Sequence, residues 1–363
     1  MIEPFELDVP QADLDDLADR LARTRWPDEL PGAGFDYGFP LARARALADH
    51  WLNHYDWRRH EAELNAFPQF TTHVDGQRVH FLHVRSPRPD ALPLVLIHGW
   101  PGSVVEFLDV VGPLSRDFHV VVPSIPGFGL SGPTTERGWD VTRVARAFTE
   151  LMTRLGYPRY GAQGGDWGSG IAQAMGAVAP DRVVGVHVNY LPTPPVEGVE
   201  LSGEDRRRLD RIEGYLRQRP GYQVLQGTRP QTVAYALTDS PAGQLAWIAE
   251  KFTEWTDPAS AIPVDRVLTN VMLYWLTGTA GSSARLTRES GLAPKPACPA
   301  PLGVAVFAHD IVLPVRPLAE RTHRVEHWSE FDRGGHFAAL EVPDLLVADI
   351  RAFFAGRAPR ATC

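Results

Sequence analysis

The sequence has little cysteine: two residues in 363, Cys298 and Cys363, with no Cys-x-x-Cys pair and no Cys/His cluster. A chain with so few thiols has no disulfide framework, and the pattern predicts two free thiols in a reducing compartment. His73, His80 and His83 lie close together, but His80 and His83 would point to opposite sides of a strand. We therefore expect structural histidines and no metal site.

Long apolar runs are also missing, since no stretch reaches the about 18 apolar residues that a membrane-spanning helix needs. The first residues, MIEPFELDVPQ, are acidic and lack the apolar centre of a signal peptide. A net charge of -8 and an isoelectric point of about 5.9 leave no basic excess for a nucleic acid or an anionic membrane surface. We expect a cytoplasmic protein with no nucleic-acid partner and no membrane anchor.

The rest of the composition, 44% hydrophobic and 22% charged, is that of a globular protein with a large core. Proline-rich stretches and changes of pattern divide the chain into four parts. These are 1–70, an N-terminal helical arm wrapping the core and lid; 71–191, the first part of an α/β core; 192–297, a helical lid; and 298–363, the second part of the core.

Short apolar runs in the two core parts predict buried strands in a βαβ arrangement, and hence a mostly parallel sheet. The runs are 93–97, 120–122, 183–188 and 302–307, after an alternating stretch at 72–84. Residues 140–155 have apolar side chains at helical spacing and predict a helix between strands. In the lid, the basic run Arg206-Arg207-Arg208 reads as a solvated helix face.

The strongest local signal is GGDWG at 164–168, which follows an apparent strand and precedes a helix of small residues. A nucleophile between two small residues, at a strand-to-helix turn, is the pattern of a nucleophile elbow. The turn is so sharp that a side chain at either small position would clash. Asp166 occupies the nucleophile position.

An aspartate at this position indicates attack on carbon. A carboxylate can displace a leaving group at a saturated electrophilic carbon, which gives an alkyl-enzyme ester. It needs no activating base, because it is ionised near neutral pH, and a helix N-terminus favours its charge. A helix N-cap in a glycine-rich turn is the alternative interpretation of Asp166. A serine esterase is disfavoured, because Ser169 lies beyond the apex and Ser103 lies in a different loop.

HGWPG at 98–102 directly follows the apolar run 93–97. In this position the backbone N–H groups of Trp100 and Trp167 would converge on one anionic oxygen, as in an oxyanion hole. That oxygen would belong to the tetrahedral intermediate formed when water attacks the ester. A tight Gly/Pro turn is the simpler alternative.

GGHF at 334–337 follows the predicted last strand and places His336 where the base comes in the chain order nucleophile, acid, histidine. Asp310 follows the run 302–307 and would orient His336 and stabilise its imidazolium. Asp332 competes for this role, but it stands too close to His336 along the same loop.

Together these residues resemble the microsomal-type epoxide hydrolases, including juvenile-hormone, fungal and actinobacterial members. The resemblance implies an α/β-hydrolase fold with a mostly parallel central sheet, an inserted helical lid and an N-terminal helical arm. It also implies conversion of an epoxide to a vicinal diol with water and no cofactor, with Asp166 as nucleophile, Asp310 as orienting acid and His336 as base. The matching segments are TRWP at 24–27, FTT at 70–72, VHFLHV at 79–84, HGWPG at 98–102, PSIPGFG at 123–129, DSP at 239–241, LTNVMLYW at 268–275 and GGHFAALE at 334–341.

Members of this family hold the epoxide oxygen with two lid tyrosines, whose hydroxyl groups hydrogen-bond this oxygen and stabilise the leaving alkoxide. Tyr222 matches the first, but Thr287 stands where the second is expected. Tyr274, Tyr235 or Trp275 could replace it. We therefore take Thr287, Tyr274 and Tyr235 as tentative substrate-binding residues.

Two alternatives stay open. A haloalkane dehalogenase shares the aspartate, the histidine and the tryptophan after the nucleophile, and Trp167 would then bind halide. Tyr222 and the N-terminal arm favour the epoxide hydrolase. The second alternative is a non-catalytic binding protein of the same fold, for which Thr287 leaves room.

Similar actinobacterial enzymes act on aryl or styrene-type epoxides in natural-product pathways, which suggests such a role here. A homodimer is compatible with the sequence.

Overall fold

The computed structural model describes residues 1–218, 221–291 and 297–357, so Cys363 and part of the proline-rich stretch before residue 302 lie outside the described residues. The described part contains a sheet of nine strands in the order β1-β2-β3-β5-β4-β6-β7-β8-β9. The strands are β1 (Glu3–Phe5), β2 (Gln69–Val74), β3 (Gln77–Val84), β4 (Leu92–Ile97), β5 (Phe118–Pro123), β6 (Tyr160–Gly164), β7 (Val183–Val188), β8 (Leu302–Phe307) and β9 (Val325–Phe331). The pairs from β5 through β4 to β9 are parallel, and the pairs β1-β2, β2-β3 and β3-β5 are antiparallel.

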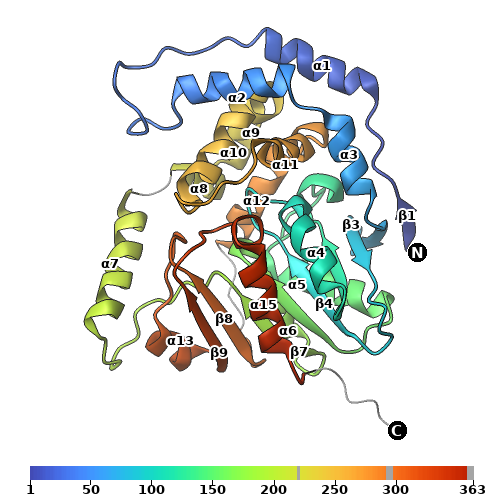
Figure 1. Cartoon of the computed structure of the whole chain (residues 1–363), viewed down its shortest axis with the longest axis vertical. Coiled ribbons are helices and arrows are strands. Elements are labelled where there is room, and N and C mark those ends of the chain that lie inside the picture. The colour runs from blue at the N-terminus through green and yellow to red at the C-terminus, as the bar shows by residue number, and fades with distance from the viewer. Residues whose placement is uncertain (219–220, 292–296, 358–363) are drawn as a thin grey trace.

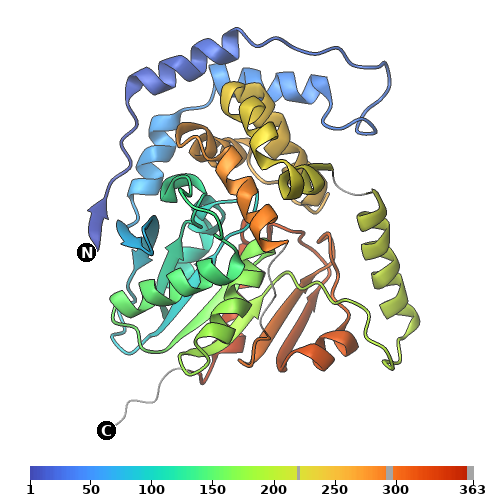
Figure 2. The same cartoon turned by 180° about the vertical axis from the view of Figure 1, so that it is seen from behind.

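The central parallel strands are mostly apolar because helices cover both faces of the sheet, whereas the edge strand β9 is partly exposed. Every residue of β4, β5, β6 and β8 is buried. Helices α4 (Leu108–Leu114) and α15 (Pro343–Phe354) cover one face (Figure 1). Helices α5 (Val141–Arg154) and α6 (Asp166–Val178) cover the other (Figure 2). The core also contains two 3₁₀-helices and two short α-helices: η1 (Val104–Phe107), η2 (Gly129–Ser131), α13 (Arg316–Thr322) and α14 (Ala338–Glu341).

Two details of the sheet differ from the sequence-based expectation. The alternating stretch at 72–84 is not one strand but the β2–β3 hairpin, turned by Asp75 and Gly76 at φ angles of 51° and 74°. Strand β1 was not expected, because three residues are too few to show an alternating pattern. The predicted helix at 140–155 is confirmed as α5, which Asp140 caps by accepting from the Arg143 N–H at 2.8 Å.

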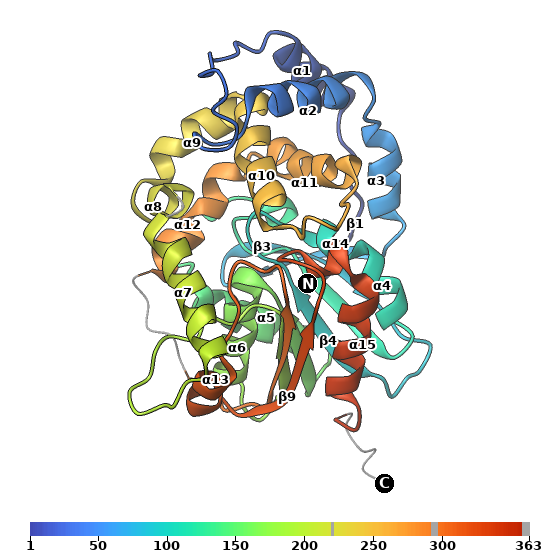
Figure 3. The same cartoon turned by 60° about the vertical axis from the view of Figure 1, so that its left-hand side comes forward.

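The described residues between β7 and β8 form six helices on the side of the sheet where the parallel strands have their carboxyl ends. They are α7 (Gly203–Gln218), α8 (Gly221–Thr228), α9 (Pro230–Asp239), α10 (Pro241–Trp255), α11 (Val264–Leu276) and α12 (Ala280–Ser290). The N-terminal helices α1 (Gln11–Ala22), α2 (Leu41–Asn53) and α3 (Trp57–Asn65) run over the top of this group and down its side (Figures 1 and 3). None of the helices in the described part combines the length and apolar character needed to cross a bilayer.

Side-chain contacts tie the N-terminal arm to the lid. Arg20 donates to the carbonyl of Asp239 at 3.0 Å, and the Trp51 indole N–H points at the sulfur of Met272 at 3.2 Å. The antiparallel strand β1 ties the start of the arm to the sheet. The arm therefore bridges the lid and the core.

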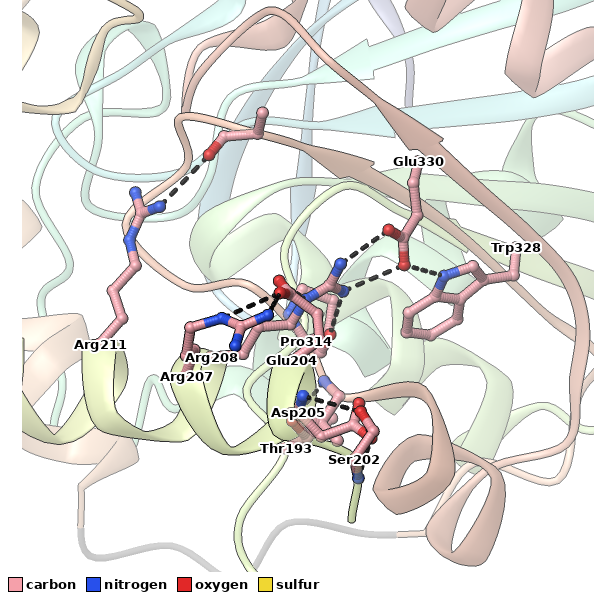
Figure 4. Close-up of polar contacts among 12 residues, drawn as sticks. Thr193, Ser202, Glu204, Asp205, Arg207, Arg208, Arg211, Pro314, Trp328 and Glu330 are labelled. Atoms are coloured by element: carbon pink, nitrogen blue, oxygen red, sulfur yellow. Dashed lines mark hydrogen bonds and ion pairs between the residues drawn. The ribbon is translucent and has the colours of Figure 1, made fainter.

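Helix α7 stands apart from the other lid helices, beside α13 and β9 (Figure 3). Arg208 forms a two-pronged pair with Glu330 of β9, at 2.7 and 3.0 Å, and donates to the carbonyl of Pro314 at 3.0 Å (Figure 4). Its side chain is only 13% exposed, whereas Arg207 stays in solvent and pairs with Glu204. The reading of 206–208 as a solvated face is therefore wrong for Arg208, because its partner lies far away in the sequence.

Candidate active site

The elbow at the end of β6 presents Asp166 as the first residue of α6, with a left-handed φ of 48°. A Cβ on Gly164 would lie 2.3 Å from the backbone of Gly168, and a Cβ on Gly168 would lie 1.9 Å from the carbonyl oxygen of Ile97. Glycine is therefore required on both sides of the turn. A left-handed aspartate is strained, and strain of this kind collects at functional sites.

The Asp166 carboxylate has two polar neighbours. Its Oδ1 accepts from the backbone N–H of Trp100 at 2.8 Å, and its Oδ2 lies 3.6 Å from His336 Nε2. Trp167 follows in the first turn of α6, where backbone N–H groups have no partner within the helix. A Cβ on Gly99 would lie 2.3 Å from the side chain of Asp166, so the loop can approach this closely only as glycine.

The loop at 98–102 is fixed from both sides. His98 accepts from the Ile125 N–H at 3.1 Å through Nε2, so its Nδ1–H donates to the Gly99 carbonyl at 3.0 Å. Burial lowers the pKa of His98 to about 4, which keeps the ring neutral. From the lid, the Tyr274 hydroxyl donates to the Gly102 carbonyl at 2.7 Å. Tyr274 thus holds the loop from α11. Because its hydroxyl proton is donated to Gly102, this contact argues against the tentative assignment of Tyr274 to substrate binding.

His336 is oriented by Asp310. Its Nδ1 lies 2.8 Å from Asp310 Oδ1, both side chains are buried, and Nε2 faces Asp166. Burial opposes the charged imidazolium, but the charges of Asp310 and Asp166 outweigh burial and raise the pKa of His336 to about 10. Asp332, the competitor for the acid role, is exposed.

Two further carboxylates hold the loop that carries His336, and neither was found from the sequence. Glu341 accepts from the backbone N–H groups of Asp257, Gly335 and Phe337 at 2.8 to 2.9 Å. Asp257, which directly follows α10 in the lid, accepts from the Gly334 N–H at 2.8 Å. The contacts that join the lid to this loop, from the Asp257 N–H to Glu341 and from the Gly334 N–H to Asp257, link positions far apart in the sequence, so no motif signals them.

A small cavity lies beside the reacting groups and is lined by Glu106, Asp166, Asn189 and His336 among others. It leaves about 10 Å³ for the centre of a water molecule, which is room for about one water. The Glu106 carboxyl fits there because a Cβ on Gly102 would lie 1.3 Å from its Oε1. Burial raises the pKa of Glu106 to about 8; His336 opposes this shift and Asp166 adds to it. Glu106 is therefore mostly uncharged at neutral pH.

Tyr222, at the start of α8, lies over the loop at 98–102. Its ring stacks on Trp100 at 4.9 Å with an angle of 11° and tilts against Trp255 at 5.5 Å. The Lys251 ammonium lies 4.9 Å from the same ring. Burial, the neighbouring Tyr215 and the charge of Asp166 all raise the pKa of Tyr222, so it stays a protonated donor.

The other tentative substrate-binding residues, and Trp275, make contacts of their own. The Thr287 hydroxyl donates to Gln226 of α8 at 3.1 Å. The Tyr235 side chain is 73% exposed, which places it outside the site and corrects that assignment. Trp275 lies under the Arg20 guanidinium of the arm, at 6.0 Å.

Two tyrosines that the sequence reasoning missed lie near the triad. The ring of Tyr190 meets His336 edge-on at 5.5 Å. The hydroxyl of Tyr215, on α7, is buried and has no hydrogen-bond partner among the described residues. Neither residue belongs to a motif; Tyr190 follows β7 in the core, and the position of Tyr215 depends on the folding of the lid.

Other candidate chemistries find no support in the described ranges. No group of three or more His, Cys, Asp or Glu side chains is arranged there to hold a metal ion. The Ser169 hydroxyl donates to the Tyr190 carbonyl, and the Ser103 hydroxyl accepts from the Val105 N–H at 3.2 Å. His80, considered among the clustered histidines, lies between Ser124 and Gln69 at 3.0 and 2.8 Å.

Comparisons with known proteins agree over nearly the whole chain. The family model described as epoxide hydrolase N terminus matches residues 2–107, and the model for the alpha/beta hydrolase fold matches residues 93–205. A predicted epoxide hydrolase of Stigmatella aurantiaca is 45% identical, over 97% of this chain and 84% of that protein. Epoxide hydrolase 1 of Sus scrofa is 34% identical, with 88% of it and 97% of this chain covered.

Among solved structures, the epoxide hydrolase of Aspergillus niger superimposes with a TM-score of 0.91 at 33% identity, over 98% of this chain and 96% of that one. Since the likeness extends across arm, core and lid, it confirms the predicted α/β-hydrolase fold.

Proposed function

This chain belongs to the epoxide hydrolase family and is an epoxide hydrolase, and we propose that it opens its substrate through a covalent ester on Asp166. One observation carries the proposal: the left-handed Asp166 carboxylate lies between the Trp100 N–H and a histidine that Asp310 orients. The Trp100 contact fixes one carboxylate oxygen in place, which positions the group for attack on carbon. A small-molecule epoxide and water are the substrates.

In the first step, an Asp166 oxygen attacks one ring carbon. The ring carbon–oxygen bond breaks, and its electron pair goes to the epoxide oxygen. Tyr222 gives that oxygen a proton, so that an alcohol forms in place of a free alkoxide. The products of this step are a hydroxyalkyl ester on Asp166 and a phenolate. The rings of Trp100, Tyr222 and Trp255 pack on one another, and we infer from this aromatic cluster an aryl epoxide of the styrene oxide type.

The second step needs a neutral His336, and the first step supplies it. Forming the ester removes the charge of Asp166, one of the two charges that raise the His336 pKa. The imidazolium then loses its proton and the phenolate regains one. His336 next takes a proton from water, and the resulting hydroxide attacks the ester carbonyl. The oxyanion is stabilised by the N–H groups of Trp100 and Trp167.

Collapse of this intermediate breaks the bond between the carbonyl carbon and the alkyl oxygen. The leaving alkoxide takes the proton of the new Asp166 hydroxyl, which releases the vicinal diol. Asp166 is again a carboxylate and His336 again an imidazolium, so the cycle closes on epoxide and water alone.

The cavity beside Asp166 is large enough for one water molecule, and it is our candidate position for the water that attacks the ester. Glu106, mostly uncharged at neutral pH, can accept from a water and donate to it. Because it carries little charge there, it does not compete with Asp166 and Asp310 for the His336 imidazolium. We assign the position of the water to this cavity.

The test of the ester is a trapping experiment with styrene oxide. Asp166→Ala should abolish turnover, and His336→Gln should gain the mass of one epoxide, on the peptide that contains residue 166. A His336→Gln protein that is folded but gains no mass, or gains it on another peptide, would contradict the proposal.

The finer expectations belong to the same proposal. We infer a cytoplasmic enzyme, with a homodimer and a role in natural-product biosynthesis as hypotheses to be tested by gel filtration and by gene neighbourhood. The haloalkane dehalogenase and the non-catalytic protein are disfavoured, because the relatives that match over nearly the whole chain are epoxide hydrolases.

A further inference from the structure

One face of α7 is held against the loop that carries Asp310. Arg211 donates to the Asp310 carbonyl at 2.6 Å and to the Ala308 carbonyl at 3.3 Å. It lies about one helical turn beyond Arg208, which pairs with Glu330 (Figure 4). Since Asp310 also bonds His336, this face of α7 runs beside the catalytic triad.

Tyr215 lies on the same face, four residues after Arg211. Residues at that spacing lie one above the other on a helix, with a rise of about 6 Å along its axis. The step leads from the Asp310 loop towards the start of α8, where Tyr222 stacks on Trp100.

Among the described residues, the buried Tyr215 hydroxyl has no hydrogen-bond partner. Buried hydroxyls almost always make a hydrogen bond, and an orphan of this kind calls for an explanation. Burial raises the pKa of Tyr215 to about 12; the Tyr222 hydroxyl opposes the shift and the charge of Asp166 adds to it. Tyr215 is therefore a protonated donor that lies near both of these residues.

We propose that Tyr215 is a second catalytic tyrosine, whose hydroxyl binds the epoxide oxygen together with Tyr222 and supplies the hydrogen bond that Thr287 does not. This inference rests on the proposed function and names a further residue in its first step. As the ring carbon–oxygen bond breaks, its electron pair goes to the epoxide oxygen, and both phenols donate to that oxygen. One of them transfers its proton, and the other remains a hydrogen-bond donor to the new alcohol.

Such a donor acts where charge develops. The hydrogen bond from Tyr215 to the epoxide oxygen strengthens as that oxygen becomes negative, which lowers the barrier more than it tightens substrate binding. Thr287 cannot take this role while its hydroxyl donates to Gln226. Tyr190 is the competing phenol, since its ring contacts His336.

The test measures ester formation separately from ester hydrolysis. In a His336→Gln background, the rate at which styrene oxide adds its mass to the protein is followed by rapid acid quench and intact mass spectrometry. Tyr215→Phe should slow this rate by about 10- to 100-fold, the value of one hydrogen bond to a charged oxygen. The exposed Tyr235→Phe is the matched control and should stay within twofold.

A second readout separates catalysis from folding. Because no described residue hydrogen-bonds the hydroxyl, Tyr215→Phe should leave the Tm unchanged or raise it while it slows the ester step. A Tyr215→Phe rate within twofold of its parent, or a greater loss in Tyr190→Phe, would overturn the proposal. If the His336→Gln parent gains no mass, the ester mechanism fails. The role of Tyr215 is then decided in the otherwise wild-type enzyme, by comparing the kcat/KM of Tyr215→Phe with that of Tyr235→Phe.

Discussion

Asp310→Asn is the substitution that best separates the two steps of the reaction. The side chain keeps its shape but loses the charge that lies 2.8 Å from His336 Nδ1. The pKa of His336 is raised from 6.5 to about 10 by Asp310 and Asp166 against the effect of burial. A shift of that size corresponds to ~5 kcal/mol in favour of the imidazolium, shared between the two carboxylates.

Once the ester has formed, Asp166 has no charge and Asp310 alone stabilises the imidazolium that develops during water attack. Asp310→Asn should therefore lower kcat by about 10³- to 10⁴-fold through the hydrolysis step, while ester formation is slowed much less. Under single-turnover conditions the ester should accumulate and be visible as added mass on the protein.

Asp332→Asn is the matched control, because the same change at an exposed position on the loop should leave kcat within twofold. The reasoning is refuted if Asp310→Asn loses less than tenfold in kcat. It is also refuted if the activity is lost and no ester accumulates, since that would place Asp310 in the first step.

Further predictions concern the loops that hold the site and the charge of the histidine. Glu341→Ala should lower the free energy of unfolding in urea by about 2–4 kcal/mol, because three backbone N–H groups lose a common acceptor; the exposed Glu320→Ala should change it by less than about 0.5 kcal/mol. Equal effects of the two would contradict the role given to Glu341. Gly168→Ala should lower specific activity by about 100-fold or more, because its Cβ would lie 1.9 Å from a backbone carbonyl of β4, whereas Gly214→Ala, with open space around it, should be active. The His336 pKa is raised on folding, so the stability that it contributes is present below pH 6.5 and is lost as the pH rises through about 10. The difference in Tm between wild type and His336→Gln should shrink over that range, and a constant difference would argue against a charged His336 in the resting enzyme.

The parts of the site that could be predicted from the sequence are those that local sterics and chain order determine. Gly164 and Gly168 flank Asp166 because the turn leaves no room for a Cβ at either position. Asp310 and His336 follow strands whose carboxyl ends meet at one edge of the sheet. These constraints act within a few residues or follow from the order of strands, so a single sequence displays them.

Contacts between segments far apart in the chain could not be predicted in the same way. Arg208 is buried by Glu330, which lies 122 positions away, and nothing in its own neighbourhood distinguishes it from the exposed Arg207. Tyr235 and Tyr215 are both lid tyrosines in helical segments, yet the first is in solvent and the hydroxyl of the second is buried near the triad. The packing of the lid helices decides which tyrosine reaches the site.

The ester on Asp166 is tested most directly by one turnover of excess enzyme with styrene oxide in water enriched in oxygen-18. After digestion, the peptide that contains Asp166 should carry one heavy oxygen on that side chain, and the diol should carry none from the solvent. A diol that carries the heavy oxygen, with Asp166 unlabelled, would show that water attacks the epoxide directly and would contradict the account.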